Sequence, residues 1–265
     1  MKRLVCTILL AIISILVFGQ KNNGTIRFLG IPVDGSETQF AARLKAKGFS
    51  YNNYLNGYKG QFNGKNVEVY IHTNHNLVDR VYVSFPATSS ERKIKNEYNI
   101  LLSQFKNTGK YSDIGSNTEI PEEEDISYEM TVNNKEYQAV FSYFDPDVNP
   151  LTRIDALLDK FQGLLPDEEI SLMKEYTKKA INLPEEEQQA LAEKMISEMS
   201  TMGLRQEVNS ESGMEKSLLL MATFIDGVRS MADGDVWFTI HENFGEYNIG
   251  LYYDNRHNKA HGEDL

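Results

Sequence analysis

An Asn-Gly pair at positions 63–64 restricts the fold of this chain more than any other feature. Asn-Gly is a preferred sequence for a two-residue hairpin turn, because both positions tolerate positive φ. The segments 67–72 and 80–85 alternate apolar and polar residues, and matching their apolar faces sets Ile71 opposite Val81. An antiparallel meander with one buried face is therefore expected. The same matching sets Val69 opposite Val83, Tyr70 opposite Tyr82, and His72 opposite Arg80.

Two helices are predicted beside this meander. Ser36 and Gln39 have the spacing of a capping box, in which side chains satisfy free backbone N–H groups at a helix start. Thr88 and Glu91 have the same spacing, so a second helix is expected to begin there. Both apolar-periodic segments end at a glycine, which suits the left-handed position after a helix end.

Two further hairpins are predicted downstream. Asn133-Asn134 is a candidate two-residue turn between alternating segments 126–130 and 137–141. Segments 236–240 and 249–253 alternate in the same way around a short loop. A helix thus precedes an antiparallel hairpin three times. The predicted fold class is α+β, with helices packed on antiparallel meander and hairpin sheets in a repeated α-β-β order, and with a helical region in the second half.

Residues 151–232 show helical rather than alternating spacing of apolar residues. Within them, 217–228 is apolar nearly all round and is predicted to be a central, buried helix. The Asp- and Pro-containing segment 145–150 interrupts the pattern and is the predicted domain boundary. The predicted organisation is a signal peptide over 1–19, an α+β domain over 20–150, and a helical region over 151–265 that ends in a β-hairpin and a polar tail.

The N-terminus has the pattern of a secretory signal peptide. Lys2-Arg3 is a basic start, Leu4–Phe18 is apolar, and Gly19 is a small residue before a cleavage point. An uncleaved membrane anchor is the alternative, but the apolar run has 15 residues and a spanning helix needs about 20. We therefore expect an exported protein, periplasmic or extracellular, with no stable membrane span after cleavage.

The composition of the processed chain excludes several classes of function. Cys6 is the only cysteine and lies in the predicted signal peptide, so disulfides, thiol nucleophiles and cysteine metal sites are excluded. Without Lys2 and Arg3 the chain has 25 basic and 38 acidic residues, a formal net charge of −13. An acidic surface repels phosphate backbones, so no nucleic-acid partner is expected.

The sequence lacks the common catalytic motifs, including nucleophile elbows, phosphate-binding glycine loops and zinc-binding H-E-x-x-H. The acidic run 121–125 could bind a hard cation, but it lacks the alternating oxygen ligands of calcium loops, and a solvated loop is expected. His257 and His261 could share a metal if the tail were helical; a frayed tail is expected instead. We predict no catalytic residue, no metal and no cofactor.

One binding surface is predicted from the meander. Its register places Tyr70 and Tyr82 side by side, with His72 and Arg80 next to them, on the face away from the buried valines. Tyrosine and arginine are enriched at binding hot spots. The alternative is that a helix from the second half covers this face, which would make the tyrosines part of a second core.

Several segments resemble a group of uncharacterised secreted or periplasmic proteins of Gram-negative bacteria. They are Phe28-Leu-Gly-Ile-Pro-Val-Asp-Gly-Ser36, Lys47-Gly-Phe49, Gly60-Gln-Phe-Asn-Gly64, Tyr252-Tyr-Asp-Asn255 and Gly262-Glu-Asp-Leu265. More distantly, helices that lead into four-stranded antiparallel sheets are similar to the β-lactamase-inhibitor-protein-like and PepSY-like folds. This resemblance implies a non-enzymatic role in binding a protein or envelope component.

Three functions remain open at this point. We favour a secreted or periplasmic binding protein whose partner is a protein or envelope component. The alternatives are an unrecognised hydrolase of cell-wall or dietary polymer and a structural component of the envelope. A deep pocket lined by convergent carboxylates or histidines would favour the enzyme, whereas a flat aromatic sheet face would favour the binding protein.

The signal peptide leads to a direct prediction. Protein recovered from the periplasm or medium should begin at Gln20, because signal peptidase cleaves after a small residue such as Gly19. N-terminal sequencing of the exported protein measures this. Exported protein that retains Met1 would contradict it.

Overall fold

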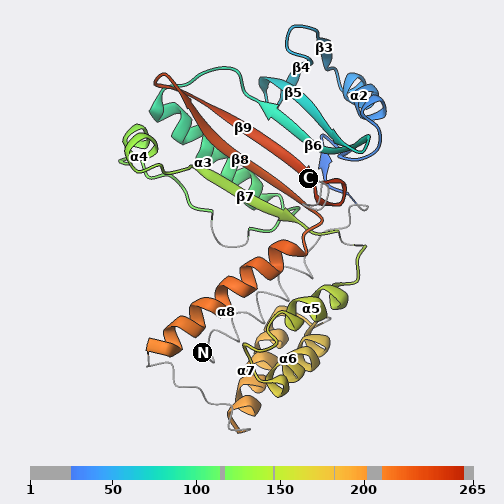
Figure 1. Ribbon diagram of the computed structural model, residues 1–265, viewed down its shortest axis with the longest axis vertical. Coiled ribbons are helices and arrows are strands. Elements are labelled where there is room, and N and C mark those ends of the chain that lie inside the picture. Colours follow the sequence, from blue (N-terminus) through green and yellow to red (C-terminus); the bar gives the residue numbers. More distant parts are fainter. Residues whose placement is uncertain (1–24, 114–116, 146, 182, 202–210, 260–265) are drawn as a thin grey trace. The chain divides into compact units, whose positions relative to one another are not determined.

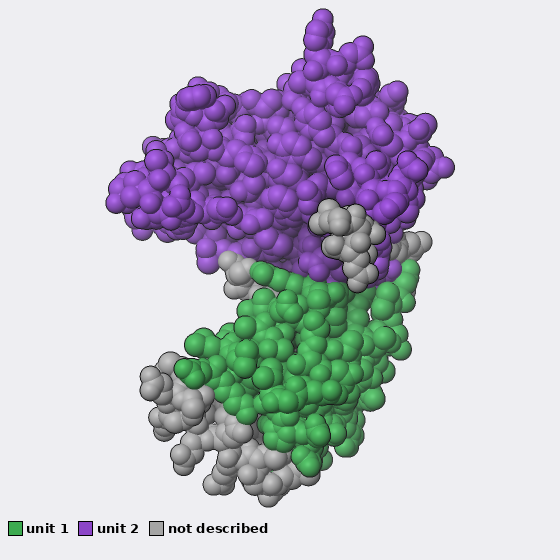
Figure 2. All heavy atoms as spheres, viewed as in Figure 1, with its two compact units in different colours: residues 1–21, 146–231 green, residues 22–145, 232–265 purple. Residues whose placement is uncertain are grey.

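The computed structural model describes residues 25–113, 117–145, 147–181, 183–201 and 211–259. The chain is α+β and divides into two compact units (Figure 2). One unit, called the sheet unit, combines Asn22–Asp145 with Ala232–Leu265. The other, called the helical unit, contains the described residues between 147 and 231. The predicted signal peptide lies outside the described residues.

The sheet unit contains a two-stranded sheet and a seven-stranded antiparallel sheet (Figure 1). The strands are β1 (Arg27–Phe28), β2 (Ile31–Pro32), β3 (Ser50–Asn52), β4 (Gly57–Phe62), β5 (Lys65–Asn74), β6 (Leu77–Ser84), β7 (Gln138–Tyr143), β8 (Gly234–Asn243) and β9 (Glu246–Asn255). The large sheet has the order β3-β4-β5-β6-β9-β8-β7. The hairpin nearest the C-terminus therefore lies inside the sheet, between β6 and β7.

The predicted registers of the meander and of the last hairpin are confirmed. Asn63 and Gly64 have φ of 50° and 74°, as a two-residue hairpin turn requires. All four predicted β5–β6 pairs, including Tyr70 opposite Tyr82, are present. In the last hairpin Phe238 lies opposite Leu251. These registers follow from local alternation, so the sequence was sufficient to predict them.

Sequence analysis grouped the last hairpin with the helical region, whereas the structure places it in the large sheet. Strand β9 pairs with β6, and Val83 lies opposite Leu251. The apolar face of the hairpin needs a buried partner, and the apolar face of β6 provides one. Alternation within a strand shows which face is buried but does not identify the neighbouring strand.

The predicted hairpin around Asn133-Asn134 is wrong. Residues 126–132 form helix α4 (Ile126–Val132), which begins where the Asp125 side chain accepts a hydrogen bond from the Tyr128 N–H at 2.9 Å. Ile126 and Met130 are four residues apart, so the pattern that suggested a strand also places both on one helix face. Strand β7 pairs with β8 instead, and the α-β-β order does not occur three times.

Two longer helices pack on one face of the large sheet, α2 (Glu37–Ala46) and α3 (Glu91–Asn107). The predicted start of α2 is confirmed by the Ser36 hydroxyl, which accepts a hydrogen bond from the Gln39 N–H at 3.4 Å. The predicted capping box at Thr88 is wrong, because Ser90 occupies the N-cap position. Glu91 instead accepts a hydrogen bond from the Ile126 N–H at 3.0 Å and so joins α3 to α4.

An aromatic cluster fills the core between α3 and the sheet. Phe238 is fully buried, and its ring centroid lies 5.1 Å from that of Tyr98 and 5.7 Å from that of Phe105. Phe141 of β7 completes the cluster, with its centroid 6.4 Å from that of Phe238. The last hairpin therefore supplies a central core residue.

The helical unit contains the helices α5 (Pro150–Asp159), α6 (Asp167–Ala180), α7 (Glu185–Thr201) and α8 (Glu211–Ser230). The expectation of burial all round the 217–228 helix is wrong. Leu220 and Val228 are buried, but Leu218 and Leu219 are 63% and 50% exposed. Helix α8 contacts its neighbours along one side, where Gly227 leaves room for the side chain of Leu157 on α5.

Truncation of the central core residue should destabilise the sheet unit strongly. Phe238→Ala removes a fully buried ring and should lower the free energy of unfolding by about 3–5 kcal/mol. Phe244→Ala, in the same hairpin at 97% exposure, is the control and should stay within about 0.5 kcal/mol of wild type. Urea unfolding followed by Trp237 fluorescence measures both changes. Equal effects would contradict the observed packing.

Candidate binding surface

Four aromatic side chains form a continuous row across four strands of the large sheet. Tyr70 of β5 lies opposite Tyr82 of β6, Tyr82 lies opposite Tyr252 of β9, and Tyr252 lies opposite Trp237 of β8. Their neighbours along each strand point to the core beneath α2 and α3, so these four side chains lie on the other face. We call this row the aromatic ladder and its face the outer face. All four side chains are partly exposed.

The rings of the ladder stack on one another. Ring-centroid distances are 5.6 Å for Tyr70–Tyr82, 4.6 Å for Tyr82–Tyr252 and 3.7 Å for Trp237–Tyr252, with interplanar angles of 20°, 18° and 5°. Tyr82 and Tyr252 each have a stacked ring on both sides. Neighbouring rings therefore cover their flat faces, and the ladder presents ring edges and hydroxyl groups.

Two glycines leave room for the ladder. A Cβ atom at Gly57 would lie 2.9 Å from the ring of Tyr70. At Gly250 a Cβ atom would lie 3.0 Å from the ring of Tyr82 and 3.1 Å from that of Tyr252. Neither distance accommodates a side chain without movement of the rings. Because Gly57 and Gly250 have no side chain, the tyrosine rings can occupy these positions.

A row of polar residues runs beside the ladder on the same face. The members of this row lie opposite one another across the strands in the order His72, Arg80, Asp254, Asp235 and Ser142. Arg80 donates two hydrogen bonds to Asp254, at 2.6 and 2.9 Å. Its guanidinium also lies 5.8 Å from the ring centroids of Trp237 and Tyr252, a cation–π distance. The polar row therefore supports one end of the ladder.

Asp254 is the central acceptor of this arrangement. Its side chain is 2% exposed and also accepts hydrogen bonds from the Trp237 indole N–H at 3.1 Å and from Lys259 at 2.7 Å. Burial alone raises the pKa of Asp254, but hydrogen bonds from Arg80 and Lys259 outweigh it and hold the pKa below its ordinary value. The carboxylate is thus ionised at neutral pH and fixes the indole.

The hydroxyl groups of Tyr70 and Tyr252 remain protonated at neutral pH. Partial burial, reinforced by the neighbouring Tyr82, raises the pKa of Tyr252 to about 12. Burial and the adjacent Glu68 raise the pKa of Tyr70, whose hydroxyl donates to Glu68 at 3.0 Å. The Tyr70 hydroxyl, which already donates to Glu68, can still accept a hydrogen bond through its oxygen.

The structure brings together most, but not all, of the residues predicted as a binding site. Tyr70 and Tyr82 lie in the ladder, and Arg80 lies beside it. His72 is 69% exposed and bonds Asp79 at 2.7 Å, so it lies at the margin of the surface. Sequence analysis did not find Tyr252, Trp237 and Asp254. Alternation in the last hairpin showed that 252 and 237 share a face, but not that this face continues the one with Tyr70.

The side edges of the large sheet offer little room for another strand. On the outer edge of β7, Ser112 and Ser142 exchange backbone hydrogen bonds of 2.8 and 2.9 Å. The Asn117 amide pairs with both backbone groups of Val140, at 2.7 and 2.8 Å. The opposite edge strand, β3, has only three residues. Such covered or short edges disfavour the addition of another strand.

The acidic and histidine-containing segments are held in ordinary ion pairs. Glu122 pairs with Arg92, and Glu124 accepts hydrogen bonds from Lys135 and Tyr137. His257 bonds Asp233 at 3.0 Å, whereas residue 261 lies outside the described residues. Within the described ranges, no group of three or more potential ligands is placed to hold a metal ion.

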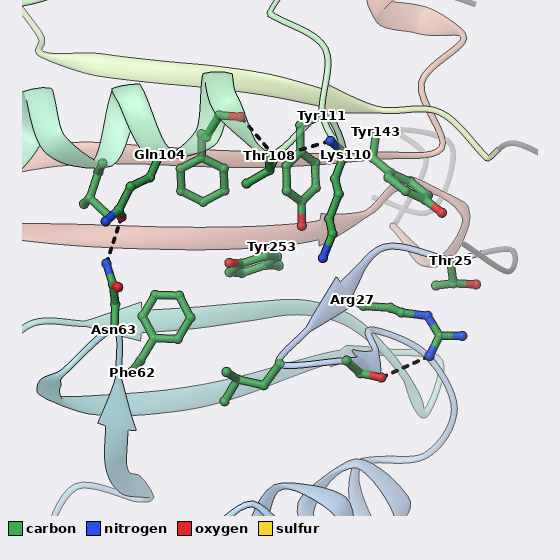
Figure 3. Close-up of a pocket in the computed structure, with 14 residues that line it drawn as sticks. Thr25, Arg27, Phe62, Asn63, Gln104, Thr108, Lys110, Tyr111, Tyr143 and Tyr253 are labelled. Carbon is green, nitrogen blue, oxygen red and sulfur yellow. Dashed lines mark hydrogen bonds between the residues drawn. The ribbon is translucent and has the colours of Figure 1, made fainter. Parts of the chain in front are cut away.

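A pocket with a volume of about 540 Å³ lies on the helix-covered side of the sheet unit (Figure 3). It is lined by α3, by the segment that follows α3, by the turn between β1 and β2, and by Tyr253 of β9. Among the described residues, its lining includes no aspartate, glutamate or histidine. The convergent acid and base groups expected of a hydrolase are therefore not found in this lining.

Comparisons with protein-family models, with curated proteins and with solved structures found no match to the chain. The resemblance to secreted Gram-negative proteins and to the β-lactamase-inhibitor-protein-like and PepSY-like folds stays a prediction. In the part of the chain that the structure describes, no helix has both the length and the apolar character needed to cross a membrane.

The environment of Asp254 leads to a pH-dependent prediction. Asp254→Asn should lower the free energy of unfolding at pH 7 by about 2–3 kcal/mol. This is less than the cost of breaking a fully buried ion pair, because Arg80 and Lys259 are partly exposed. Since the folded-state pKa is depressed, this stabilisation is complete above about pH 4 and is lost as the pH falls through the folded-state value. The difference between wild type and variant should therefore shrink in acid.

Urea unfolding between pH 3 and pH 7 measures this difference, and the pH range brackets the ordinary carboxylate pKa of about 4. Glu246→Gln, an exposed carboxylate in the same strand, is the control and should change stability little at any of these pH values. If Asp254→Asn lowers the free energy of unfolding by the same amount at every pH, the charge of the carboxylate is not what stabilises the site.

Proposed function

We propose that this chain is an exported, non-enzymatic binding protein whose outer face, centred on the aromatic ladder, binds a protein partner of the cell envelope. The observation that carries the proposal is the ladder itself. Four partly exposed aromatic side chains, with an arginine beside them, span four adjacent strands. Tryptophan, tyrosine and arginine are the residues most enriched at protein-binding hot spots.

The orientation of the rings favours a protein over a sugar or a nucleobase. Sugars and bases bind aromatic residues by stacking on the flat face of a ring. In the ladder, the flat faces of Tyr82 and Tyr252 are covered on both sides by neighbouring rings. Exposed ring edges and hydroxyls suit a protein surface, where apolar contacts and hydrogen bonds alternate.

The rigidity of the ladder also supports a binding role. Stacking and the hydrogen bond from Trp237 to Asp254 restrict the side chains before any partner arrives. Side chains ordered in advance lose less conformational entropy on association. The covered edge of β7 and the short β3 make strand addition unfavourable, so the partner is expected to dock on the face.

A hydrolase receives less support from the described residues. The pocket lining contains no carboxylate or histidine. Asp254 and Asp235, the buried acids of the outer face, are each held by an arginine, Arg80 and Arg256 respectively. Asp254, whose pKa is held below its ordinary value, is a poor general acid at neutral pH.

A blocking substitution beside the ladder tests the proposal. Ser84 lies two residues from Tyr82 on the same face, so Ser84→Arg should project a long charged side chain over the binding surface. The control is Ser103→Arg on the exposed side of α3, which makes the same chemical change away from the ladder. Immobilised wild type and Ser103→Arg should retain the same protein from an envelope extract of the producing cells, and Ser84→Arg should retain at most about a tenth as much.

The fluorescence of Trp237 reports on the ladder directly, because Trp237 is the only tryptophan in the chain. Addition of the retained protein should change the emission of Trp237 in wild type and in Ser103→Arg, but not in Ser84→Arg. The proposal would be contradicted if wild type, Ser103→Arg and Ser84→Arg all retained the same protein. It would also be contradicted if binding left the emission of Trp237 unchanged. In either case the ladder would serve only to stabilise the sheet.

A further inference from the structure

The pocket on the helix-covered side belongs to the sheet unit alone, and it lies on the opposite side of the sheet from the ladder. Tyr252 and Tyr253 are consecutive in β9, so their side chains point to opposite faces. Tyr252 joins the ladder, while Tyr253 lines the pocket and lies between α3 and the β1–β2 segment (Figure 3). The pocket is thus a site separate from the proposed binding surface.

The body of the pocket is apolar. Helix α3 contributes Leu101 and Phe105 to the lining, and Leu29 and Phe62 of β4 also line the pocket. Figure 3 shows Tyr253 between Phe62 and α3. The volume of about 540 Å³ is within the range of small-molecule sites, which combine apolar walls with a few polar groups. This pocket therefore suits a ligand with an apolar body of modest size.

The charges at the pocket have one sign only. Arg27 and Lys110 line it, and no aspartate or glutamate does so among the described residues. The whole chain has 38 acidic and 27 basic residues, so a lining with two cations and no acid departs from the composition of the chain. A concentrated positive charge in an acidic protein favours an anionic ligand.

The two charged groups lie toward one end of the pocket, whereas Asn63 donates a hydrogen bond to Gln104 at 2.8 Å near Phe62, at the other end (Figure 3). Figure 3 shows the Lys110 side chain extending into the pocket beside Tyr111, toward Arg27 and the β1–β2 segment. Arg27 donates a hydrogen bond to the Gly30 carbonyl at 3.0 Å, which helps to orient its guanidinium. Burial raises the pKa of Tyr111, so its hydroxyl stays protonated and can donate a hydrogen bond. Phe62 lies toward the other end (Figure 3).

We infer that this pocket binds a small amphipathic carboxylate, with its apolar body between α3 and β4 and its carboxylate beside Lys110. The apolar walls account for the body, and Lys110 with the Tyr111 hydroxyl accounts for the anionic group. A neutral alcohol of the same length would lack the charge interaction. An amine of the same length would place a cation beside Lys110 and Arg27.

Calorimetric titration with octanoate, octanol and octylammonium tests this inference on the processed protein. Octanoate should bind saturably, and octanol and octylammonium should bind at least about tenfold more weakly, because opposite charges attract and like charges repel at the same position. Lys110→Glu should weaken octanoate binding at least about tenfold. Lys45→Glu, an exposed position on α2, makes the same change in net charge away from the pocket and should change the affinity less than about twofold.

A second variant tests the location without changing a charge. Gln104 lines the pocket from an exposed position of α3, so Gln104→Trp should fill part of the volume and remove octanoate binding. Unchanged melting temperatures would show that the variants are folded. Absence of saturable octanoate binding to wild type would overturn the inference, as would equal binding of octylammonium or unchanged affinity in both Lys110→Glu and Gln104→Trp.

Discussion

The pairing of β6 with β9 is the interaction on which the rest of the structure depends. It joins residues that are far apart in the chain, such as Arg80 and Asp254, and it connects the N-terminal meander to β7 and β8. Closing so long a loop costs conformational entropy, although the cost grows slowly with length. Burial of apolar side chains on both strands, including Val81 and Leu251, offsets it.

This pairing also separates two surfaces with different chemistry. Because side chains alternate along β9, Tyr252 and Tyr253 lie on opposite faces, one in the ladder and the other in the pocket. On the outer face, stacked rings and the buried carboxylate of Asp254 produce a rigid surface of ring edges and hydroxyls. On the other face, α3 and the β1–β2 segment enclose apolar volume next to Lys110. The protein partner and the small carboxylate that we propose would therefore contact opposite faces of the sheet.

The incorrect predictions have a common physical cause. A short apolar pattern can satisfy two structures, as with Ile126 and Met130, which are compatible with a strand face and with one face of α4. The apolar segment of α8 likewise shows that apolar residues all round a helix do not ensure burial, because burial requires neighbours on every side. In both cases the local sequence restricts the structure, and packing makes the choice.

The sequence by itself determined the elements whose partners lie close in the chain: the Asn63-Gly64 turn, the β5–β6 and β8–β9 registers, the start of α2, and the α+β class. It also identified Tyr70, Tyr82 and Arg80 as neighbours, because one hairpin register fixes them. Only the tertiary structure decided that Tyr252 and Trp237 extend this row, and that Asp254 lies beneath Arg80. The reason is that periodicity reports the buried face of a strand, whereas the identity of a distant neighbour depends on how complete apolar faces fit together.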